Sequence, residues 1–518
     1  MPAAQGGPQH DKSHHGFFRR HWTHLVGAAL GAGLICFGYE VYSMRHPPAQ
    51  LPQDPSKPNL VVLGSGWAAT ALLTDLDTER YNVIVISPRN YFLFTPLLPS
   101  CTVGTLELRS IMQPMRYITR FKSREVLFVE GDATDIDPVK KTVTVTDNSE
   151  IKGEVSTQTF SYDHLVVATG ADNATFGIKG VYENACFLKE AWDARKIRTK
   201  LMDCIETAAF PGQTDAEIDR LLHMVVVGGG PTGVEYAAEL HDFLKDDLAA
   251  WYPELASRVR ITLIEALPHV LPMFSKTLID YTEQTFAENK VAIRNRTMVK
   301  EVRQKEIVVQ CADKSIEHIP YGLLVWATGN MPRPINRQLI AKIGPSAQNQ
   351  RRGIVVDECL RVKGAENIWA LGDASATSFP PTAQVASRQG RYLASLFNRA
   401  AEAQAAADAH HEAQLLSDTE RRSRAVVDLQ TATDIPPFTH TNLGSLAYIG
   451  ADRAIADLPS PASLFTSEKT PGWSFGGVAT FWFWRSAYLS NLFALRNRVL
   501  VSVDWMRNSI FGRDIGRE

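Results

Sequence analysis

The chain has 518 residues, of which 45% are hydrophobic and 21% charged, a composition typical of a globular protein. A chain of this length is too long for one hydrophobic core, so two or three domains are expected. Its 54 Lys and Arg are balanced by 56 Asp and Glu, so no excess of positive charge is available to bind nucleic acid. The cysteines lack CxxC and CxxxxC spacing, which predicts isolated thiols and no metal site.

The N-terminal region differs in composition from the rest of the chain. Residues 1–24 are polar and His-rich and are expected to form a flexible tail. The apolar segment from Leu25 to Met44 is about long enough to cross a bilayer. A membrane span is favoured there, with a cleaved targeting segment or a buried helix as alternatives. The Pro-rich stretch from Pro47 to Pro58 follows as a stiff linker.

Beyond the linker, short apolar runs alternate with helical patterns, which predicts parallel sheets covered by helices. The apolar run 59–63 leads into GSGWAA, a GxGxxA form of the dinucleotide fingerprint. Gly64 permits the tight turn, Gly66 lets a pyrophosphate approach the backbone, and Ala69 lets the helix pack closely on the strand. The next strand ends in Ser87, Pro88 and Arg89, without the usual acid. Ser87 or Arg89 is expected to take over the ribose contact.

A second unit of the same kind begins at residue 224. Its sequence MVVVGGGPTG carries Gly228, Gly230 and Gly233 in the full GxGxxG form. Its second strand ends in Glu265, which can accept both ribose hydroxyls and would repel a 2'-phosphate, so NADH is preferred to NADPH. The stretch from Val234 to Arg258 is predicted to be one extended crossover helix.

Each unit is followed by a strand that ends in Ala-Thr-Gly, at residues 165–170 and 324–329. A further apolar strand, 367–371, ends in Gly-Asp. Asp373 at its end is well placed to hold the ribityl chain of a flavin. The order of these motifs resembles that of the two-dinucleotide-binding-domain flavoproteins.

Within that superfamily, the chain resembles the type II, or alternative, NADH:quinone oxidoreductases, especially those of fungal mitochondria. The resemblance covers residues 57–514 and rests on SPRNYFLFTPLLP (87–99), residues 225–235, EALP (265–268), PPTAQVA (380–386) and FWFWRSAYLS (481–490). It implies an α/β fold with two Rossmann-like dinucleotide-binding domains, like that of glutathione reductase, and a C-terminal membrane-anchoring domain. The chain is expected to divide into a tail and linker (1–56), a first FAD-binding segment (57–195), an NADH-binding domain (196–345), a second FAD-binding segment (346–450) and an interfacial anchor (451–518).

The resemblance also implies the roles of individual residues. FAD would bind non-covalently around Gly64, Gly66, Ala69, Ser87, Arg89, Thr95, Thr169, Gly170 and Asp373. NADH would bind on Gly228, Gly230, Gly233 and Glu265, with Gly329 near the nicotinamide. The quinone would reach the flavin beside Ala383 and Gln384, in an AQxAxQ motif whose second glutamine is here Arg388.

Two residues are expected to act with Gln384 in catalysis. Glu235 matches a glutamate near the flavin and quinone, although a first-turn acid that only stabilises its helix is an equal alternative. Tyr488 resembles the tyrosine at the quinone entrance, with an ordinary interfacial aromatic as the alternative. From Phe481 to Arg513, aromatic and aliphatic residues alternate with arginines, which predicts helices that lie in the headgroup layer of a membrane.

The expected activity is hydride transfer from NADH to FAD and two-electron reduction of ubiquinone, without proton pumping. The expected partners are NADH, a membrane quinone, the lipid bilayer and a second copy of the chain. The expected location is the mitochondrial inner membrane facing the intermembrane space, with the matrix side as the alternative. A sulfide:quinone oxidoreductase using Cys186 and Cys359, and an NADH-sensing flavoprotein of the apoptosis-inducing-factor kind, are the rival interpretations.

Overall fold

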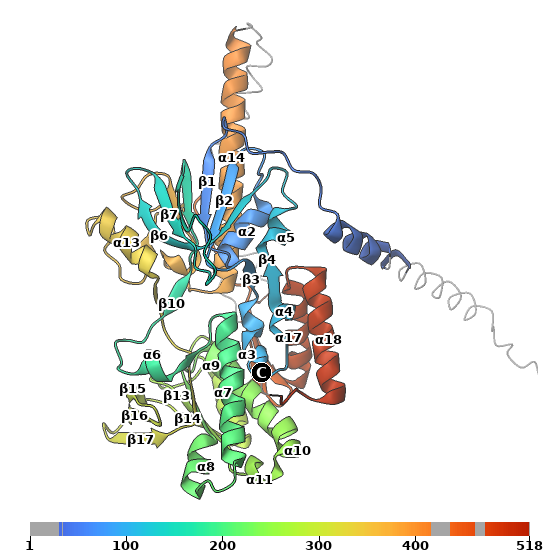
Figure 1. Cartoon of the computed structure of the whole chain (residues 1–518), viewed down its shortest axis with the longest axis vertical. Helices are drawn as coiled ribbons and strands as arrows, with labels where there is room; N and C mark the ends of the chain where they lie inside the picture. Colours follow the sequence, from blue (N-terminus) through green and yellow to red (C-terminus); the bar gives the residue numbers. More distant parts are fainter. Residues whose placement is uncertain (1–30, 34, 416–435, 461–471, 517–518) are drawn as a thin grey trace, which may run out of the picture.

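The computed structural model describes residues 31–33, 35–415, 436–460 and 472–516 (Figure 1). Its first domain is built on a parallel sheet of five strands. Their order across the sheet is β21 (Ile368–Ala370), β9 (His164–Val167), β1 (Asn59–Leu63), β2 (Asn82–Ser87) and β5 (Leu127–Glu130). The strands are apolar and mostly buried, as expected for a parallel sheet that is covered on both faces.

Helices and a second sheet cover this first sheet. Helices α2 (Trp67–Asp75) and α14 (Ala383–Leu415) pack on each other so closely that a Cβ at Gly390 would lie 2.2 Å from the Ala68 carbonyl oxygen. The antiparallel sheet of β6 (Asp132–Asp137), β7 (Thr142–Thr146) and β8 (Thr157–Ser161) lies against α13 (Pro334–Ile343). The far end of α14, which holds the Ala-rich segment 400–414, projects from the body (Figure 1).

The second domain repeats this plan. Its parallel sheet has the order β11 (Cys186–Phe187), β18 (Leu323–Trp326), β12 (His223–Val227), β13 (Arg260–Ile264) and β14 (Val291–Arg294). Around it lie α7 (Ala191–Ala209), α8 (Asp215–Leu221), α9 (Pro231–Phe243), α12 (Lys276–Glu288) and the antiparallel strands β15 (Met298–Val302), β16 (Glu306–Gln310) and β17 (Ile316–Pro320). The two-stranded ribbon of β10 (Ala171–Asn173) and β19 (Asn330–Pro332) joins the domains.

The expected crossover helix from Val234 to Arg258 is not continuous. Helix α9 ends at Phe243 and is followed by a π-helical turn, η2 (Leu244–Leu248), and by two short helices, α10 (Ala249–Trp251) and α11 (Pro253–Ala256). Pro253 closely follows the end of α10, and a proline cannot continue a helix without loss of a backbone hydrogen bond. The run is helical as far as Trp251, with a π-helical segment inside it, and breaks at Tyr252, so the single-helix prediction was wrong only beyond Trp251.

The C-terminal region forms a small unit of its own. Strands β23 (Ser445–Gly450), β24 (Arg453–Leu458) and β25 (Trp473–Gly477) make an antiparallel sheet, followed by α17 (Val478–Asn491) and α18 (Leu495–Phe511). Because β23 and β24 form a hairpin, the domain boundary expected at residue 451 runs through this sheet. Strand β23 packs on α9, which places this unit beside the second glycine motif.

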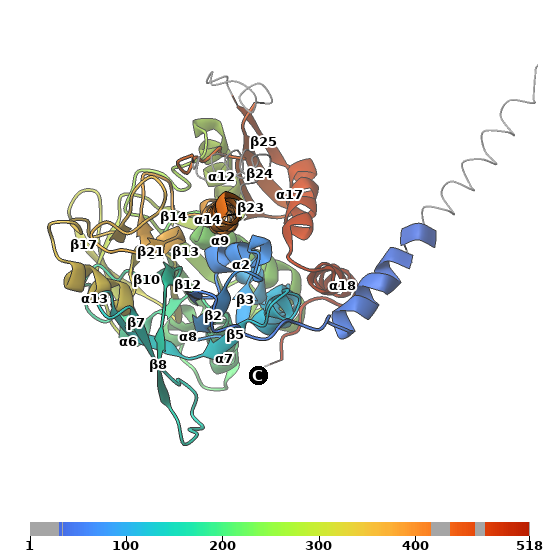
Figure 2. The ribbon, with the colours of Figure 1, turned by 90° about the horizontal axis from the view of Figure 1, so that it is seen from above.

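The N-terminal segment is described only from residue 31 onward. Residues 31–33 and 35–45 are helical, and this helix leaves the body on the side of α17 and α18 in both ribbon views (Figures 1 and 2). Among the residues that the structure describes, none of the helices is both long and apolar enough to span a bilayer. The predicted span 25–44 begins outside the described residues.

Candidate functional site: two glycine turns, one in each domain

The first glycine motif forms a tight turn between β1 and α2. Gly64 has a φ of +112°, and a Cβ there would lie 2.4 Å from the Ala168 carbonyl oxygen, so only glycine fits. Gly66 is the N-cap of α2 and faces open space, and no side chain caps the helix. Ala69 is fully buried against the sheet. The free N–H groups of α2 therefore face a space suited to a phosphate.

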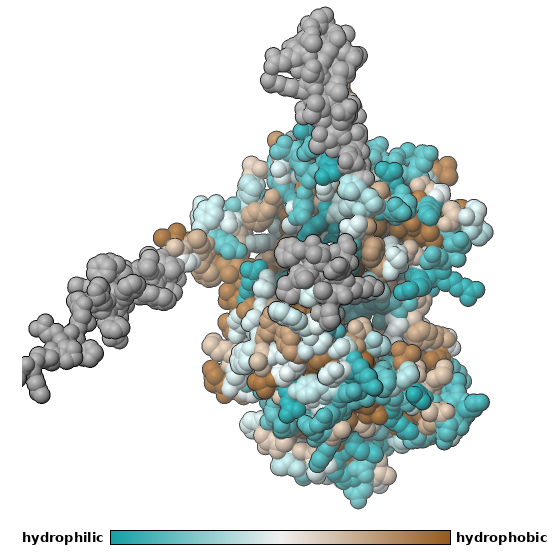
Figure 3. Space-filling view, turned by 180° about the vertical axis from the view of Figure 1, so that it is seen from behind, coloured by the Kyte–Doolittle hydropathy of each residue, from teal (hydrophilic) through white to brown (hydrophobic). Residues whose placement is uncertain are grey.

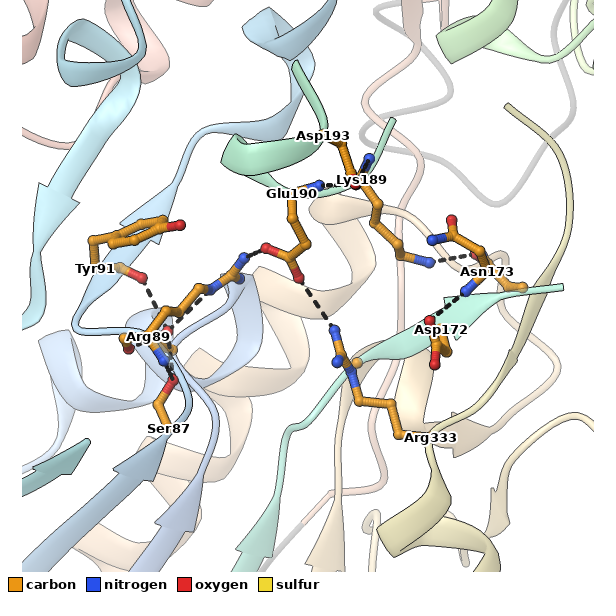
Figure 4. A network of polar contacts seen from close by, with 12 residues as sticks. Ser87, Arg89, Tyr91, Asp172, Asn173, Lys189, Glu190, Asp193 and Arg333 are labelled. Atoms are coloured by element: carbon orange, nitrogen blue, oxygen red, sulfur yellow. Dashed lines mark hydrogen bonds and ion pairs between the residues drawn. The ribbon is translucent and has the colours of Figure 1, made fainter. Parts of the chain in front are cut away.

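The last residue of β2 and the residues just after it hold this turn in place. Ser87 donates a hydrogen bond from its Oγ to Ser65 Oγ at 2.9 Å, and Arg89 Nε donates to the same oxygen at 3.3 Å. The Arg89 guanidinium also pairs with Glu190, which bonds Arg333 at 3.2 Å (Figure 4). Both residues proposed for the ribose contact thus lie at the glycine turn, and a carboxylate from elsewhere in the chain joins them.

Asp373 follows β21, in the sheet that carries the first glycine turn, and a Cβ at the neighbouring Gly372 would lie 3.7 Å from the Cβ of Ala68 in α2. It belongs to η3 (Gly372–Ala374), and burial raises the pKa of its carboxyl, while the nearby Lys189 lowers it. The Gly372 N–H donates to Gln389 Oε1 at 2.6 Å, while Gln389 Nε2 is buried without a protein partner among the described residues. Asp373 and Gln389 line a cavity of about 240 Å³, which also has Asn330 in its wall.

Three further residues are expected near the flavin. Thr95 Oγ1, in η1 (Thr95–Leu97), accepts a hydrogen bond from Trp67 Nε1 at 3.0 Å. Thr169 Oγ1 donates to Asn336 Oδ1 at 2.9 Å. Gly170 has a φ of +69° and faces open space. These residues can line a long ligand that runs from the first glycine turn to Asp373.

The second glycine motif repeats the turn of the first. Gly228 has a φ of +118°, and a Cβ there would lie 2.6 Å from the Ala327 carbonyl oxygen. A Cβ at Gly233 would lie 1.9 Å from the Gly228 carbonyl oxygen, while Gly230, the N-cap of α9, faces open space. Gly329 has a φ of +79° and is packed against Phe176.

Glu265 reaches back to this turn from the end of β13. Its Oε2 accepts from the Gly229 N–H at 2.5 Å and its Oε1 from the Leu267 N–H at 2.7 Å. A carboxylate beside this turn repels a ribose 2'-phosphate and can accept ribose hydroxyls. The geometry thus fits NADH better than NADPH.

Glu235 and Tyr488 come together beside the first turn of α9. Glu235 is 6% exposed, and burial raises the pKa of its carboxyl to about 8, against the opposing effect of the Tyr448 N–H at 3.3 Å. The ring of Tyr488 lies 4.8 Å from that of Trp484 and 6.2 Å from that of Phe94. Burial raises the pKa of the Tyr488 hydroxyl, and Glu235 is near enough to add to this effect.

Two further acids on the same face of α9 were not predicted. Glu239 accepts hydrogen bonds from Ser100 Oγ and Thr105 Oγ1, each at 2.7 Å. Asp242 accepts from the Tyr448 hydroxyl and from the Ala451 N–H. The sequence signal was present, because 235, 239 and 242 share one face of a helix that is otherwise apolar. Glu235 is therefore one of three buried acidic residues in a row along α9, each of which accepts hydrogen bonds.

The other residues expected at the quinone site lie at the start of α14. Ala383 is its first residue, and Gln384 Oε1 accepts from the Leu443 N–H at 3.3 Å. Burial lowers the pKa of the His440 imidazole, and the nearby Arg388 lowers it further. Gln389, one position after Arg388, bonds the Gly-Asp turn and so does not take the place of the missing second glutamine.

The cysteines do not form the pair that sulfide chemistry would need. Cys186 lies in β11 of the second domain, whereas Cys359 lies in the first domain beside Tyr392. All six thiols are free. The arrangement offers no support for a reaction that uses Cys186 and Cys359 together.

Comparisons with known proteins agree with this architecture. A family model described as pyridine nucleotide-disulphide oxidoreductase matches residues 58–390, and one described as NDH2 C-terminal domain matches 442–514. The chain is 50% identical to the external alternative NADH-ubiquinone oxidoreductase of Yarrowia lipolytica, over 99% of this chain and 89% of that protein. It is 43% identical to the external NADH-ubiquinone oxidoreductase 2 of Saccharomyces cerevisiae, over 93% and 88%.

A solved structure shows the same fold. NDH2 from Plasmodium falciparum, in complex with NADH, superposes with a TM-score of 0.77 at 27% identity and covers 89% of this chain and 100% of that chain. The sulfide:quinone oxidoreductase of Aquifex aeolicus, at 20% identity and a TM-score of 0.61 over 88% of this chain and 95% of that chain, shares the fold alone. The chain therefore belongs to the pyridine nucleotide-disulphide oxidoreductase family, with the C-terminal domain of the NDH2-type NADH-ubiquinone oxidoreductases.

Proposed function

We propose that the chain is an NADH–ubiquinone oxidoreductase that holds FAD non-covalently and moves no protons across the membrane. The observation that carries this proposal is the pair of glycine turns in one chain, the second with Glu265 beside it. The curated relatives named above carry this activity in their names and are mitochondrial. We place the chain at the mitochondrial inner membrane, facing the intermembrane space.

The residues of the first domain fit FAD. Gly64, the open N-cap Gly66 and the buried Ala69 form a phosphate cradle, and Asp373 lies where it can accept a ribityl hydroxyl. FAD, when bound, accepts a hydride from NADH and passes two electrons to the quinone. The protein positions both substrates, and this positioning supplies much of the rate.

Glu235 is suited to hold and release a proton during this reaction. With a pKa of about 8 it is mostly protonated at neutral pH, and so it can donate a proton from its carboxyl to a reduced quinone oxygen. Trp484 is buried, and the ring of Tyr488, which is partly buried, lies 4.8 Å from it. Gln384 lies at the start of α14, where an amide can hydrogen-bond a quinone carbonyl.

The C-terminal helices supply membrane contact in this proposal. Helix α18 turns two of its polar residues toward the body: Asn497 donates to two backbone carbonyls, and Asp504 accepts from the Ser110 hydroxyl and the Glu107 N–H. Large apolar side chains of this unit are left exposed: Trp473, Phe475, Val478, Trp482, Phe483, Val499, Val503, Met506, Ile510 and Phe511. Apolar residues are visible along this flank of the body (Figure 3). A helix with exposed apolar side chains can lie in the headgroup layer of a membrane.

The activity is tested with the purified full-length protein in lipid or detergent. We expect rapid NADH oxidation that depends on a ubiquinone analogue and is much slower with NADPH. Quinone-independent NADH oxidation alone, or bleaching of the flavin by sulfide but not by NADH, would contradict the proposal. The homodimer stays a prediction, which light scattering of the purified protein would check.

A further inference from the structure

The dipeptide Lys189–Glu190, just before α7, lies between the two domains. Helix α7 packs on β11 and β18 of the second sheet, so this dipeptide is carried by the second domain. The Asp193 carboxylate accepts the backbone N–H groups of both residues, at 3.0 and 2.9 Å. Their backbone is thus fixed at the helix N-terminus, and their side chains extend toward the first domain (Figure 4).

Both side chains meet groups around the site proposed for FAD. Glu190 pairs with Arg89, which itself bonds the first glycine turn through Ser65, and with Arg333, the N-cap of α13. Lys189 Nζ donates to Asn330 Oδ1 at 2.7 Å and lies near Asp373. The Glu190 side chain is 12% exposed and that of Arg89 is 16% exposed, so this contact is shielded from solvent.

The combined charge of Glu190, Arg89 and Arg333 suits the diphosphate of a dinucleotide. One carboxylate between two guanidinium groups leaves one positive charge unmatched, beside a helix N-terminus without a side-chain cap. The second strand of this unit lacks the acid that ordinarily ends it. Glu190, from a distant segment of the chain, brings a carboxylate close to the end of this strand.

We propose that Glu190 is a positioning residue for FAD: it holds Arg89 against the first glycine turn, and this contact takes the place of the missing acid. This inference rests on one part of the proposed function, namely that the chain binds FAD. Because Glu190 belongs to the second domain, FAD binding and the contact between the domains stabilise each other.

The test measures how fast the holoenzyme releases FAD after dilution, from the rise in flavin fluorescence. We expect Glu190→Gln to speed release by roughly ten- to a hundredfold, as for the loss of a charge-assisted hydrogen bond. Arg89→Gln should have a similar effect, and the double variant should be little worse than either single one. The matched control is Glu217→Gln, since Glu217 also bridges two cations, Arg220 and Lys305, but lies on α8.

A Glu190→Gln protein that releases FAD at the wild-type rate would overturn the inference, and so would fully additive effects of the two substitutions. Circular dichroism of each holoenzyme checks that the fold is kept. Even where both single variants lose stability, the double variant shows whether Glu190 acts through Arg89. A wild-type protein that holds FAD but fails to reduce quinone would contradict the proposed function but not this inference. The rates of FAD release would then still decide the role of Glu190.

Discussion

Replacing Glu235 by Gln removes the buried proton donor beside Tyr488 and keeps the shape of the side chain. Because the pKa of Glu235 is raised from 4.5 to about 8, the wild-type carboxyl is protonated in about nine molecules of ten at pH 7 and in about one of ten at pH 9. Quinone reduction that needs this proton should therefore slow about tenfold over that range. The amide cannot donate in this way, so we expect a loss of roughly a hundredfold at pH 7.

The assay separates the two half-reactions by rapid mixing. Flavin reduction by NADH should stay near the wild-type rate in Glu235→Gln, while flavin reoxidation by a ubiquinone analogue becomes slow and loses its pH dependence between 7 and 9. A variant with wild-type reoxidation, or with the wild-type pH profile at a lower rate, would refute the assignment. Glu235 would then only stabilise the start of α9.

The same substitution has a second readout that does not involve catalysis. The folded protein keeps the Glu235 proton over a pH range in which the unfolded chain has released it, so this group makes the free energy of unfolding fall as pH rises from about 4.5 to about 8. The slope is at most about 1.4 kcal/mol per pH unit. Glu239, whose pKa is also raised by burial, contributes in the same direction, so Glu235→Gln should flatten the dependence only incompletely.

Three further experiments with variants test other regions of the protein. Gly64→Ala would put a Cβ 2.4 Å from a carbonyl oxygen at a φ of +112°, so we expect protein that purifies largely without flavin absorbance, whereas Gly153→Ala, where a Cβ meets no close neighbour, should not differ from wild type. Glu265→Ser should raise kcat/KM for NADPH at least about tenfold relative to NADH, and an unchanged ratio would contradict the role of Glu265. Trp482→Ser with Phe511→Ser should reduce flotation with liposomes while NADH-dependent flavin reduction is kept.

Local features of this chain were predictable because short-range rules determine them. Gly64 and Gly228 adopt the positive φ that a strand–turn–helix motif requires, and Glu265 lies at the end of β13 as its position in the motif indicates. These predictions depend on a few neighbouring residues. The motifs were therefore sufficient to predict most of the fold and the positions of both nucleotide turns.

Features that depend on tertiary contacts were missed. No local pattern brings Glu190 to Arg89, because they lie in different domains and about a hundred residues apart in the chain. The role of Gln389 was not predicted either, because its bond to Gly372 depends on how α14 packs on η3. The crossover helix breaks at Tyr252 because Pro253 cannot continue a helix, although the amphipathic pattern suits one long helix.

The central claim is that two nucleotide turns bring NADH to a bound flavin. An anaerobic titration of the purified protein with NADH, followed by absorbance at the flavin band, tests it most directly. We expect the yellow colour to disappear at about one NADH per flavin and to return when a ubiquinone analogue is added. A protein that is colourless after gentle purification, or one that stays yellow in excess NADH, would contradict the account.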